Sequence, residues 1–136
     1  MRRRTWCILT VLIVIPVGIA WRALPLHLPF FAWKYGGSVL WTVALYWTVA
    51  ALLPRLRPAS VALLSAVLSM LVEFSRLVNL APLNAFRATL AGKLFLGRYF
   101  SVKNIAAYWV AIAVLLVMDI NLMKIKAKPL PEASHD

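Results

Sequence analysis

The most chemically distinctive residues of this sequence are an acid and a base, Glu73 and Arg76, inside the apolar stretch of residues 59–78. In a helix with about 100° per residue, the polar side chains of this stretch share an arc of roughly 80°: Ser65, Ser69, Glu73 and Arg76. An ionisable group in a membrane span costs on the order of 3 kcal/mol or more unless it is paired or hydrated. Glu73 is therefore a candidate site residue. The alternative is a Glu73–Arg76 pair, one turn apart, that only fixes helix packing.

Other polar residues are predicted to converge with Glu73 at one end of the helices. Basic residues flank the apolar stretches, and two polar residues lie near the start of the last stretch. The predicted ligand or ion-pair cluster consists of Glu73, Arg76, Lys34, Arg22, Arg87, Asn104 and Tyr108. Because an unpaired carboxylate at this depth would be costly, we expect Glu73 to contact a basic group. Arg76 is the first candidate, followed by Lys34 and then Arg22.

Asp119 is predicted to belong to the opposite end of the molecule. It follows Asn104 by 15 residues, which is about 22 Å along a helix. We therefore expect its carboxylate to pair with a base at its own end, and the candidates are Arg2, Arg3, Arg4 and Lys124.

The composition indicates an integral membrane protein. Of 136 residues, 63% are hydrophobic and only 14% are charged, which is unlike a soluble domain. The formal net charge of +11 comes from bases that sit between apolar stretches. Anionic lipid headgroups are the expected partners, and nucleic acid is not expected. The chain has a single cysteine, Cys7, and its two histidines, His27 and His135, lack ligand spacing. We therefore predict no disulfide, metal or other cofactor.

Length and patterning predict an all-α integral membrane protein with a single transmembrane domain over residues 1–136. Four apolar stretches have membrane length, at about residues 5–22, 36–53, 59–79 and 102–123, and a polar tail follows over residues 124–136. The first stretch follows a basic N-terminus like that of a signal peptide. It lacks a small-residue cleavage site, so we expect it to be retained. Residues 22–35 are expected to lie along the membrane interface.

Capping residues are predicted at three helix starts. Ser38 follows two glycines and is expected to cap the second span, and Ser101 is expected to cap the fourth. Asn84 is expected to cap a short interfacial or re-entrant helix between the third and fourth spans, which ends near Gly92.

The basic residues favour cytoplasmic termini in the cell inner membrane. This orientation places eight bases inside, Arg2, Arg3, Arg4, Arg55, Arg57, Lys124, Lys126 and Lys128, and seven outside, Arg22, Lys34, Arg76, Arg87, Lys93, Arg98 and Lys103. The raw numbers barely differ. The compact clusters that directly flank the spans carry the most weight under the positive-inside rule, and these clusters lie on the side predicted to be cytoplasmic.

An ordered series of motifs resembles a family of small multi-pass bacterial membrane proteins whose domain is described as being of unknown function. The series covers about residues 22–119 and consists of Lys34-Tyr35-Gly36-Gly37, Leu40-Trp41, Glu73-Phe74-Ser75, Ala81-Pro82-Leu83, Arg87-Ala88-Thr89, Gly92, Gly97, Phe100-Ser101 and Tyr108. More distantly, a Glu on the third span, a base before the second and an Asn opening the fourth are similar to the VanZ-like proteins associated with teicoplanin resistance.

The chain departs from the pattern of that family at four positions. The resemblance implies Asp at positions 38, 84 and 104 and Gln at position 76, where the chain has Ser38, Asn84, Asn104 and Arg76. Capping ability is kept while negative charge is lost. Glu73 is then the only acid near the outer end, which weakens a mechanism based on paired carboxylates.

Three classes of function follow from these observations. The first is a protein that binds or handles an anionic lipid or a lipid-linked phosphate at the outer leaflet, since arginines can grip phosphate with two hydrogen bonds. The second is an accessory subunit that packs against a larger membrane protein complex. An enzyme is the least supported class, because general acid–base catalysis usually needs paired groups and no nucleophile constellation is visible.

Overall fold

The computed structural model describes residues 3–97 and 99–127, and these form helices and loops without strands. The helices are α1 (Arg3–Ala23), α2 (Phe30–Leu52), α3 (Pro58–Ser75), α4 (Ala81–Ala88), α5 (Leu90–Phe95) and α6 (Val102–Ala127). Four of them, α1, α2, α3 and α6, are long and apolar enough to cross a membrane, as the sequence predicts. Arg2, Arg98 and the part of the predicted polar tail from residue 128 onward lie outside the described residues.

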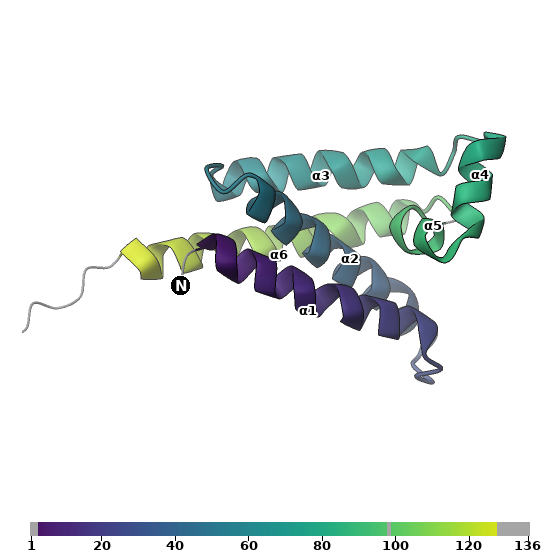
Figure 1. Ribbon diagram of the computed structural model, residues 1–136, viewed down its shortest axis with the longest axis horizontal. Helices are drawn as coiled ribbons and strands as arrows, with labels where there is room; N and C mark the ends of the chain where they lie inside the picture. Colours follow the sequence, from purple (N-terminus) through teal and green to yellow (C-terminus); the bar gives the residue numbers. More distant parts are fainter. Residues whose placement is uncertain (1–2, 98, 128–136) are drawn as a thin grey trace, which may run out of the picture.

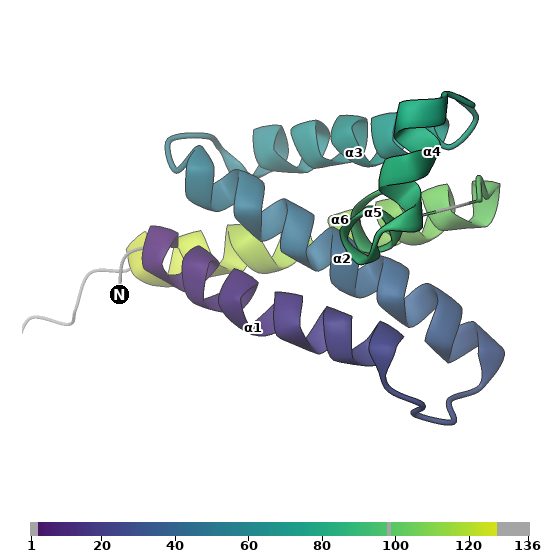
Figure 2. The same ribbon diagram turned by 45° about the vertical axis from the view of Figure 1, so that its right-hand side comes forward.

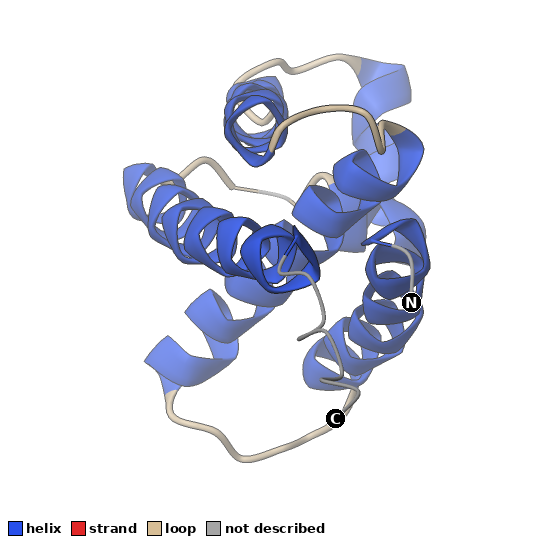
Figure 3. Cartoon of the chain, turned by 90° about the vertical axis from the view of Figure 1, so that its left-hand side faces the viewer, coloured by secondary structure: helices blue, strands red, loops and turns tan. Residues whose placement is uncertain are grey.

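The four long helices run back and forth between the two ends of the molecule (Figures 1 and 2). The start of α1, the α2–α3 turn and the end of α6 lie at one end, and the short helices α4 and α5 lie at the other (Figure 1). Helices α2, α3 and α6 pack against one another, while α1 packs mainly against α2. Figure 3 views the molecule along the bundle, and loops alone join the helices. The two ends of the bundle are therefore built from different parts of the chain.

Helix α2 begins six residues earlier than the sequence predicts, at Phe30. Its first turn follows Pro29, whose carbonyl accepts a hydrogen bond from the Trp33 backbone nitrogen at 3.0 Å. The prediction that Ser38 caps this helix is wrong, because Ser38 lies inside α2 and its hydroxyl donates to the Lys34 carbonyl. The predicted interfacial segment 22–35 is accordingly part helix, part loop.

The glycine pair that suggested a helix start is instead a packing site within α2. A side-chain carbon at Gly36 would lie 2.7 Å from the indole ring of Trp21, and one at Gly37 would lie 2.5 Å from Nε of Arg22. Small residues let neighbouring membrane helices approach closely. Gly36 and Gly37 therefore allow the end of α1 to pack directly on α2.

The connection between the third and fourth long helices holds two short helices, where one was predicted. Helix α3 ends at Ser75, four residues before the predicted boundary. The prediction that Asn84 caps a short helix is wrong, because α4 begins at Ala81 and includes Asn84. Thr89 separates the two helices, and its hydroxyl accepts a hydrogen bond from the Gly92 backbone nitrogen at 3.0 Å, which caps α5.

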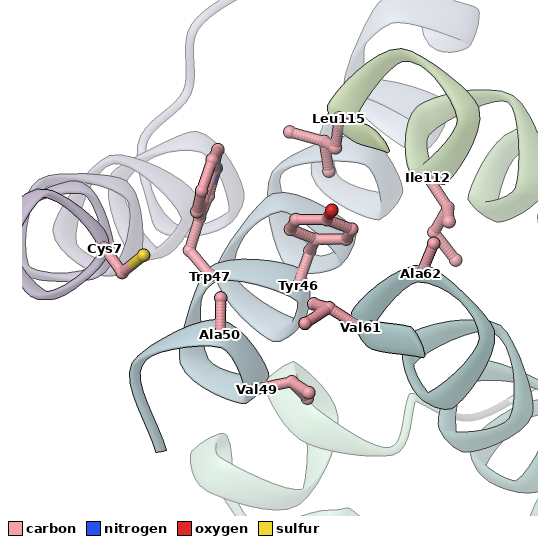
Figure 4. Packing of buried hydrophobic residues seen from close by; sticks show 9 residues of the cluster. All are labelled: Cys7, Tyr46, Trp47, Val49, Ala50, Val61, Ala62, Ile112 and Leu115. Atoms are coloured by element: carbon pink, nitrogen blue, oxygen red, sulfur yellow. The ribbon is translucent and has the colours of Figure 1, made fainter. Parts of the chain in front are cut away.

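The apolar core lies where α2, α3 and α6 meet. Tyr46 of α2, Val61 of α3 and Leu115 of α6 are almost fully buried, and Figure 4 shows them facing one another. Cys7 reaches the same cluster from α1, beside Trp47 (Figure 4). This packing holds the three inner helices together at the end away from α4 and α5.

Polar side chains are buried beside the apolar core, and many apolar side chains are exposed. Ser65 and Ser69 of α3 are completely buried, as the predicted polar stripe requires, whereas Leu12 of α1 and Val110 of α6 are 63% and 66% exposed. Soluble monomers rarely expose large contiguous apolar surfaces. Buried polar groups and an apolar exterior are typical of a helix bundle in lipid.

Candidate functional site

Glu73 is completely buried near the end of α3, and every contact of its carboxylate is polar. Its Oε2 lies 2.6 Å from Nη1 of Arg76 and accepts a hydrogen bond from the Tyr108 hydroxyl at 2.9 Å. Its Oε1 accepts from the Ser101 backbone nitrogen at 2.7 Å and from Nδ2 of Asn104 at 3.4 Å. The expectation that Glu73 contacts a base, with Arg76 the first candidate, is confirmed.

Arg76 connects this carboxylate to the loop that precedes α6. Its Nε donates to the Leu96 carbonyl, and its Nη1 donates to the Tyr99 carbonyl at 3.2 Å. Its Nη2 donates to the Tyr108 hydroxyl at 3.3 Å. The loop can fold this closely over the guanidinium because Gly97 adopts φ +67°, a conformation that favours glycine. A side-chain carbon at Gly97 would lie 2.8 Å from Nη2 of Arg76.

Together these contacts form a closed network between the end of α3 and the start of α6. Both carboxylate oxygens of Glu73 have partners, and the side chain exposes no surface. Breaking a buried pair would leave a charge without a partner, which costs several kcal/mol. Glu73 therefore orients Arg76 and joins the helices, and it does not itself face a ligand.

A second arginine, Arg87 of α4, is also buried, with 6% of its surface exposed. Its Nη1 donates to the Val78 carbonyl at 2.9 Å and to Oδ1 of Asn84 at 3.3 Å, and its Nη2 donates to the Ser75 carbonyl. These carbonyls lie at and just beyond the C-terminal end of α3, where a cation is favourable. Nε of Arg87 has no hydrogen-bond partner among the described residues.

No carboxylate neutralises Arg87 within residues 3–97 and 99–127. The acidic residues in these ranges are Glu73 and Asp119, and their ion pairs are with Arg76 and Arg3. Buried charges in proteins are normally paired. The positive charge of Arg87 is therefore uncompensated by the described part of the chain.

Both arginines line an open cleft of about 470 Å³ between the end of α3, α4 and the loop before α6. The residues that line it are Arg76, Leu77, Asn79, Asn84, Arg87, Ala88 and Tyr99. Nδ2 of Asn84 donates to Oδ1 of Asn79 at 2.6 Å, and Oδ1 of Asn84 already accepts from Arg87. The side-chain oxygens of Asn79 and Asn84 thus already accept hydrogen bonds within the described residues, whereas amide N–H groups of these residues can still donate. The cleft therefore favours a ligand that accepts hydrogen bonds and carries negative charge.

The predicted cluster is divided by the structure into three groups. Asn104 and Tyr108 join Glu73 and Arg76 in the closed network. Arg87 lies apart from Glu73 and shares the cleft with Arg76. The other two predicted bases lie near the α1–α2 loop in cation–π contacts: Lys34 Nζ is 5.6 Å from the Phe30 ring centre, and the Arg22 guanidinium is 5.6 Å from that of Trp33.

Several participants were missed by sequence reasoning. The Ser101 backbone nitrogen and the carbonyls of Leu96 and Tyr99 contribute through the main chain, which carries no sequence signal. Asn79 lies four residues after the end of α3 and lines the cleft. A polar residue just past a membrane-length helix could have marked it as a candidate.

The opposite end of the bundle holds a second buried carboxylate, Asp119 of α6. Nε and Nη2 of Arg3 donate to its two oxygens at 3.0 and 2.5 Å, and the Tyr46 hydroxyl donates to Oδ2 at 3.1 Å. Nη1 of Arg3 also reaches the carbonyls of Pro54 and Leu56 in the α2–α3 turn. The prediction that Asp119 pairs with a base away from Glu73 is confirmed. The role of Tyr46 was not foreseen.

The model of a protein family, described as "Protein of unknown function (DUF2809)", matches residues 27–112. The matched region runs from the α1–α2 loop into α6 and includes the Glu73 network and the cleft. Arg3 and Asp119 lie outside it. No solved structure matches the chain.

Proposed function

Because the chain belongs to this family of proteins of unknown function, we propose a role from its site: it is a multi-pass membrane protein that binds an anionic lipid or a lipid-linked phosphate in the Arg76–Arg87 cleft. The observation that carries the proposal is Arg87, a buried cation with no carboxylate partner among the described residues, at the wall of an open cleft. A phosphate group would supply the missing negative charge and accept hydrogen bonds from N–H groups of the cleft residues.

Within this proposal the two arginines have different tasks. Arg76 is neutralised by Glu73 and held by two carbonyls, so it presents a fixed hydrogen-bond donor to the cleft. Arg87 supplies the net positive charge. The role first considered for Glu73, at the centre of a basic cluster, becomes that of a positioning residue for Arg76.

Binding without catalysis fits the arrangement better than an enzyme does. A general base must reach the proton that it removes, whereas Glu73 is fully buried and has four polar partners. Neither the hydroxyl nor the carboxylate in its network faces the cleft. We therefore propose that the protein holds or passes on its ligand unchanged.

Location follows from the same proposal. The four apolar helices would cross the inner membrane of a bacterial cell with both termini in the cytoplasm, which places the cleft at the outer leaflet. The basic clusters near the chain ends and in the α2–α3 turn support this orientation. We also propose that the chain is distantly related to the VanZ-like proteins.

A charge introduced at Asn79 tests the proposal. Asn79→Asp keeps the oxygen that accepts from Asn84, and it places a carboxylate in the cleft as an internal counter-charge for Arg87. Purified in mild detergent, the variant should retain about tenfold less co-purifying phosphate-containing lipid than the parent protein, the factor expected for one lost charge-assisted hydrogen bond. Organic extraction and mass spectrometry would measure this.

The matched control is Asn121→Asp, which makes the same chemical change at an exposed position of α6, outside the cleft. It should leave lipid retention unchanged. Arg87→Gln should behave like Asn79→Asp, provided that circular dichroism shows the helices intact. Equal lipid retention by the parent and both cleft variants would refute the proposal. A stoichiometric co-purifying polypeptide in place of lipid would favour the accessory-subunit alternative.

A further inference from the structure

The lining of the Arg76–Arg87 cleft is mixed in polarity, which a soluble anion does not explain. The two arginines and two asparagines share it with Leu77, Ala88 and Tyr99. Leu77 is 61% exposed and Tyr99 is 81% exposed. A small hydrophilic ion would be bound by the polar residues alone, so the exposed apolar residues call for a ligand with an apolar part.

The surface around the cleft continues this apolar character. Leu80 before α4, Phe86 on α4, and Leu90 and Phe95 on α5 are 58%, 44%, 65% and 60% exposed. Arg87 of α4, unlike these apolar side chains, is buried, and its guanidinium donates to the Ser75 carbonyl. Short helices that show apolar side chains outward are typical of segments that lie in the interfacial layer of a membrane.

The height of the cleft along the bundle agrees with this position. Helix α3 has 18 residues, about 27 Å at 1.5 Å per residue, which is close to the roughly 30 Å thickness of a bilayer's hydrocarbon core. Arg76 follows its last residue directly. If α3 spans the membrane, the guanidinium groups lie at the depth of lipid phosphates and Leu77 lies beside the uppermost part of the chains.

We infer that the ligand of this cleft is a membrane amphiphile that enters sideways from the lipid layer, with its phosphate between Arg76 and Arg87 and its chain against Leu77 and Tyr99. This inference rests on the proposed function and adds to it the route by which the lipid enters and the residues that its chain contacts. It excludes free phosphate or a soluble phosphate ester as the ligand bound.

Site-specific photo-cross-linking tests the inference. A benzophenone amino acid replaces Leu77, and the protein is reconstituted in vesicles of phosphatidylcholine with a minor fraction of phosphatidylglycerol of the same chains. The control places the cross-linker at Leu90, which is similarly exposed at the same end but does not line the cleft. Mass spectrometry identifies the lipid attached at each position.

Position 77 should capture phosphatidylglycerol on the order of tenfold above its share of the vesicle, the factor that one charge-assisted hydrogen bond supplies, and position 90 should capture the two lipids in proportion. Adding Asn79→Asp should abolish the enrichment at position 77. Excess inorganic phosphate or glycerol phosphate, added before irradiation, should not lower the capture of phosphatidylglycerol at position 77.

Proportional capture at position 77, or loss of the enrichment when inorganic phosphate is present before irradiation, would overturn the inference. If Asn79→Asp still lowered phosphate-lipid retention in detergent, the proposed function would stand and only the sideways route would fail. If Asn79→Asp changed neither retention nor cross-linking, both would fail together.

Discussion

Each end of the bundle contains a buried carboxylate, and the arginines that neutralise the two carboxylates come from different parts of the chain. Glu73 and Asp119 are both fully buried, and each binds one arginine and one tyrosine hydroxyl. Arg3 reaches Asp119 from the far end of the sequence and also binds carbonyls of the α2–α3 turn. Arg76 comes from the same helical region as Glu73, only three residues away.

The surroundings of the two pairs also differ. Beside the Glu73 pair lies a second buried arginine, Arg87, with no acid among the described residues to neutralise it. At the Asp119 end, the described bases other than Arg3 are exposed. Both carboxylates thus connect helices, and the surplus buried charge distinguishes the end at which we propose binding.

The largest expected loss of stability comes from removing the charge of Glu73. Glu73→Gln leaves the guanidinium of Arg76 without its anion, although that side chain is only 10% exposed. Loss of one partner of a buried pair costs roughly 3–5 kcal/mol. We expect Glu73→Gln to lower the thermal unfolding midpoint in detergent more than any other single change proposed for this protein.

Asp119→Asn provides the comparison for that measurement. Arg3 would keep its hydrogen bonds to the Pro54 and Leu56 carbonyls, and the other described bases at its end are exposed, whereas the Glu73 end holds a second buried arginine, Arg87. The loss of stability should therefore be smaller than for Glu73→Gln. An equal or larger loss of stability for Asp119→Asn would show that the Glu73–Arg76 and Asp119–Arg3 pairs do not differ in the way proposed.

Residue spacing made part of this comparison predictable. The membrane-length helices follow from apolar runs between Pro, Gly and charge, and the Glu73–Arg76 pair follows from its spacing on one helix. Asp119 could be assigned to the other end by length alone. Each of these predictions depends on one helix at a time.

What could not be predicted depends on contacts between segments. Arg87 turns inward because its guanidinium reaches the carbonyls of Ser75 and Val78 at the end of α3, and the sequence equally allowed an exposed base. Gly36 and Gly37 were interpreted as a helix start because glycine usually interrupts helices. They instead accommodate Trp21 and Arg22 inside α2. A sequence pattern does not distinguish these two uses of glycine.

A smaller loss of stability is expected when a side chain is added at Gly97, in the loop that folds over Arg76. Gly97→Ala would force φ +67° on an alanine and place its side-chain carbon 2.8 Å from Nη2 of Arg76. We expect a destabilisation of about 1–2 kcal/mol, measured as the shift of the unfolding midpoint. Gly18→Ala is the control, since its new carbon would meet Leu40 at 3.9 Å, an ordinary contact. Equal shifts for both would argue against a tightly folded loop over Arg76.

The two tyrosine hydroxyls compare the networks most directly, and one of them, that of Tyr46, gives the smallest expected effect. Tyr108→Phe removes a donor to Glu73 and an acceptor for Arg76, whereas Tyr46→Phe removes a donor to Asp119 while Arg3 still holds both of its oxygens. Hydrogen bonds to charged groups contribute about 1.5–3 kcal/mol. We expect Tyr108→Phe to lose about 2 kcal/mol.

Tyr46→Phe should lose about 1 kcal/mol, nearer the value of an ordinary hydrogen bond, because the two-pronged contact from Arg3 already satisfies Asp119. Double-mutant cycles of each tyrosine with its arginine would separate the pairwise energies. Tyr108 should couple to Arg76 through their direct hydrogen bond, whereas Tyr46 and Arg3 share only the carboxylate between them. A stronger coupling in the Asp119 network would mean that the α1–α6 connection, and not the end beside the cleft, is the more cooperative of the two.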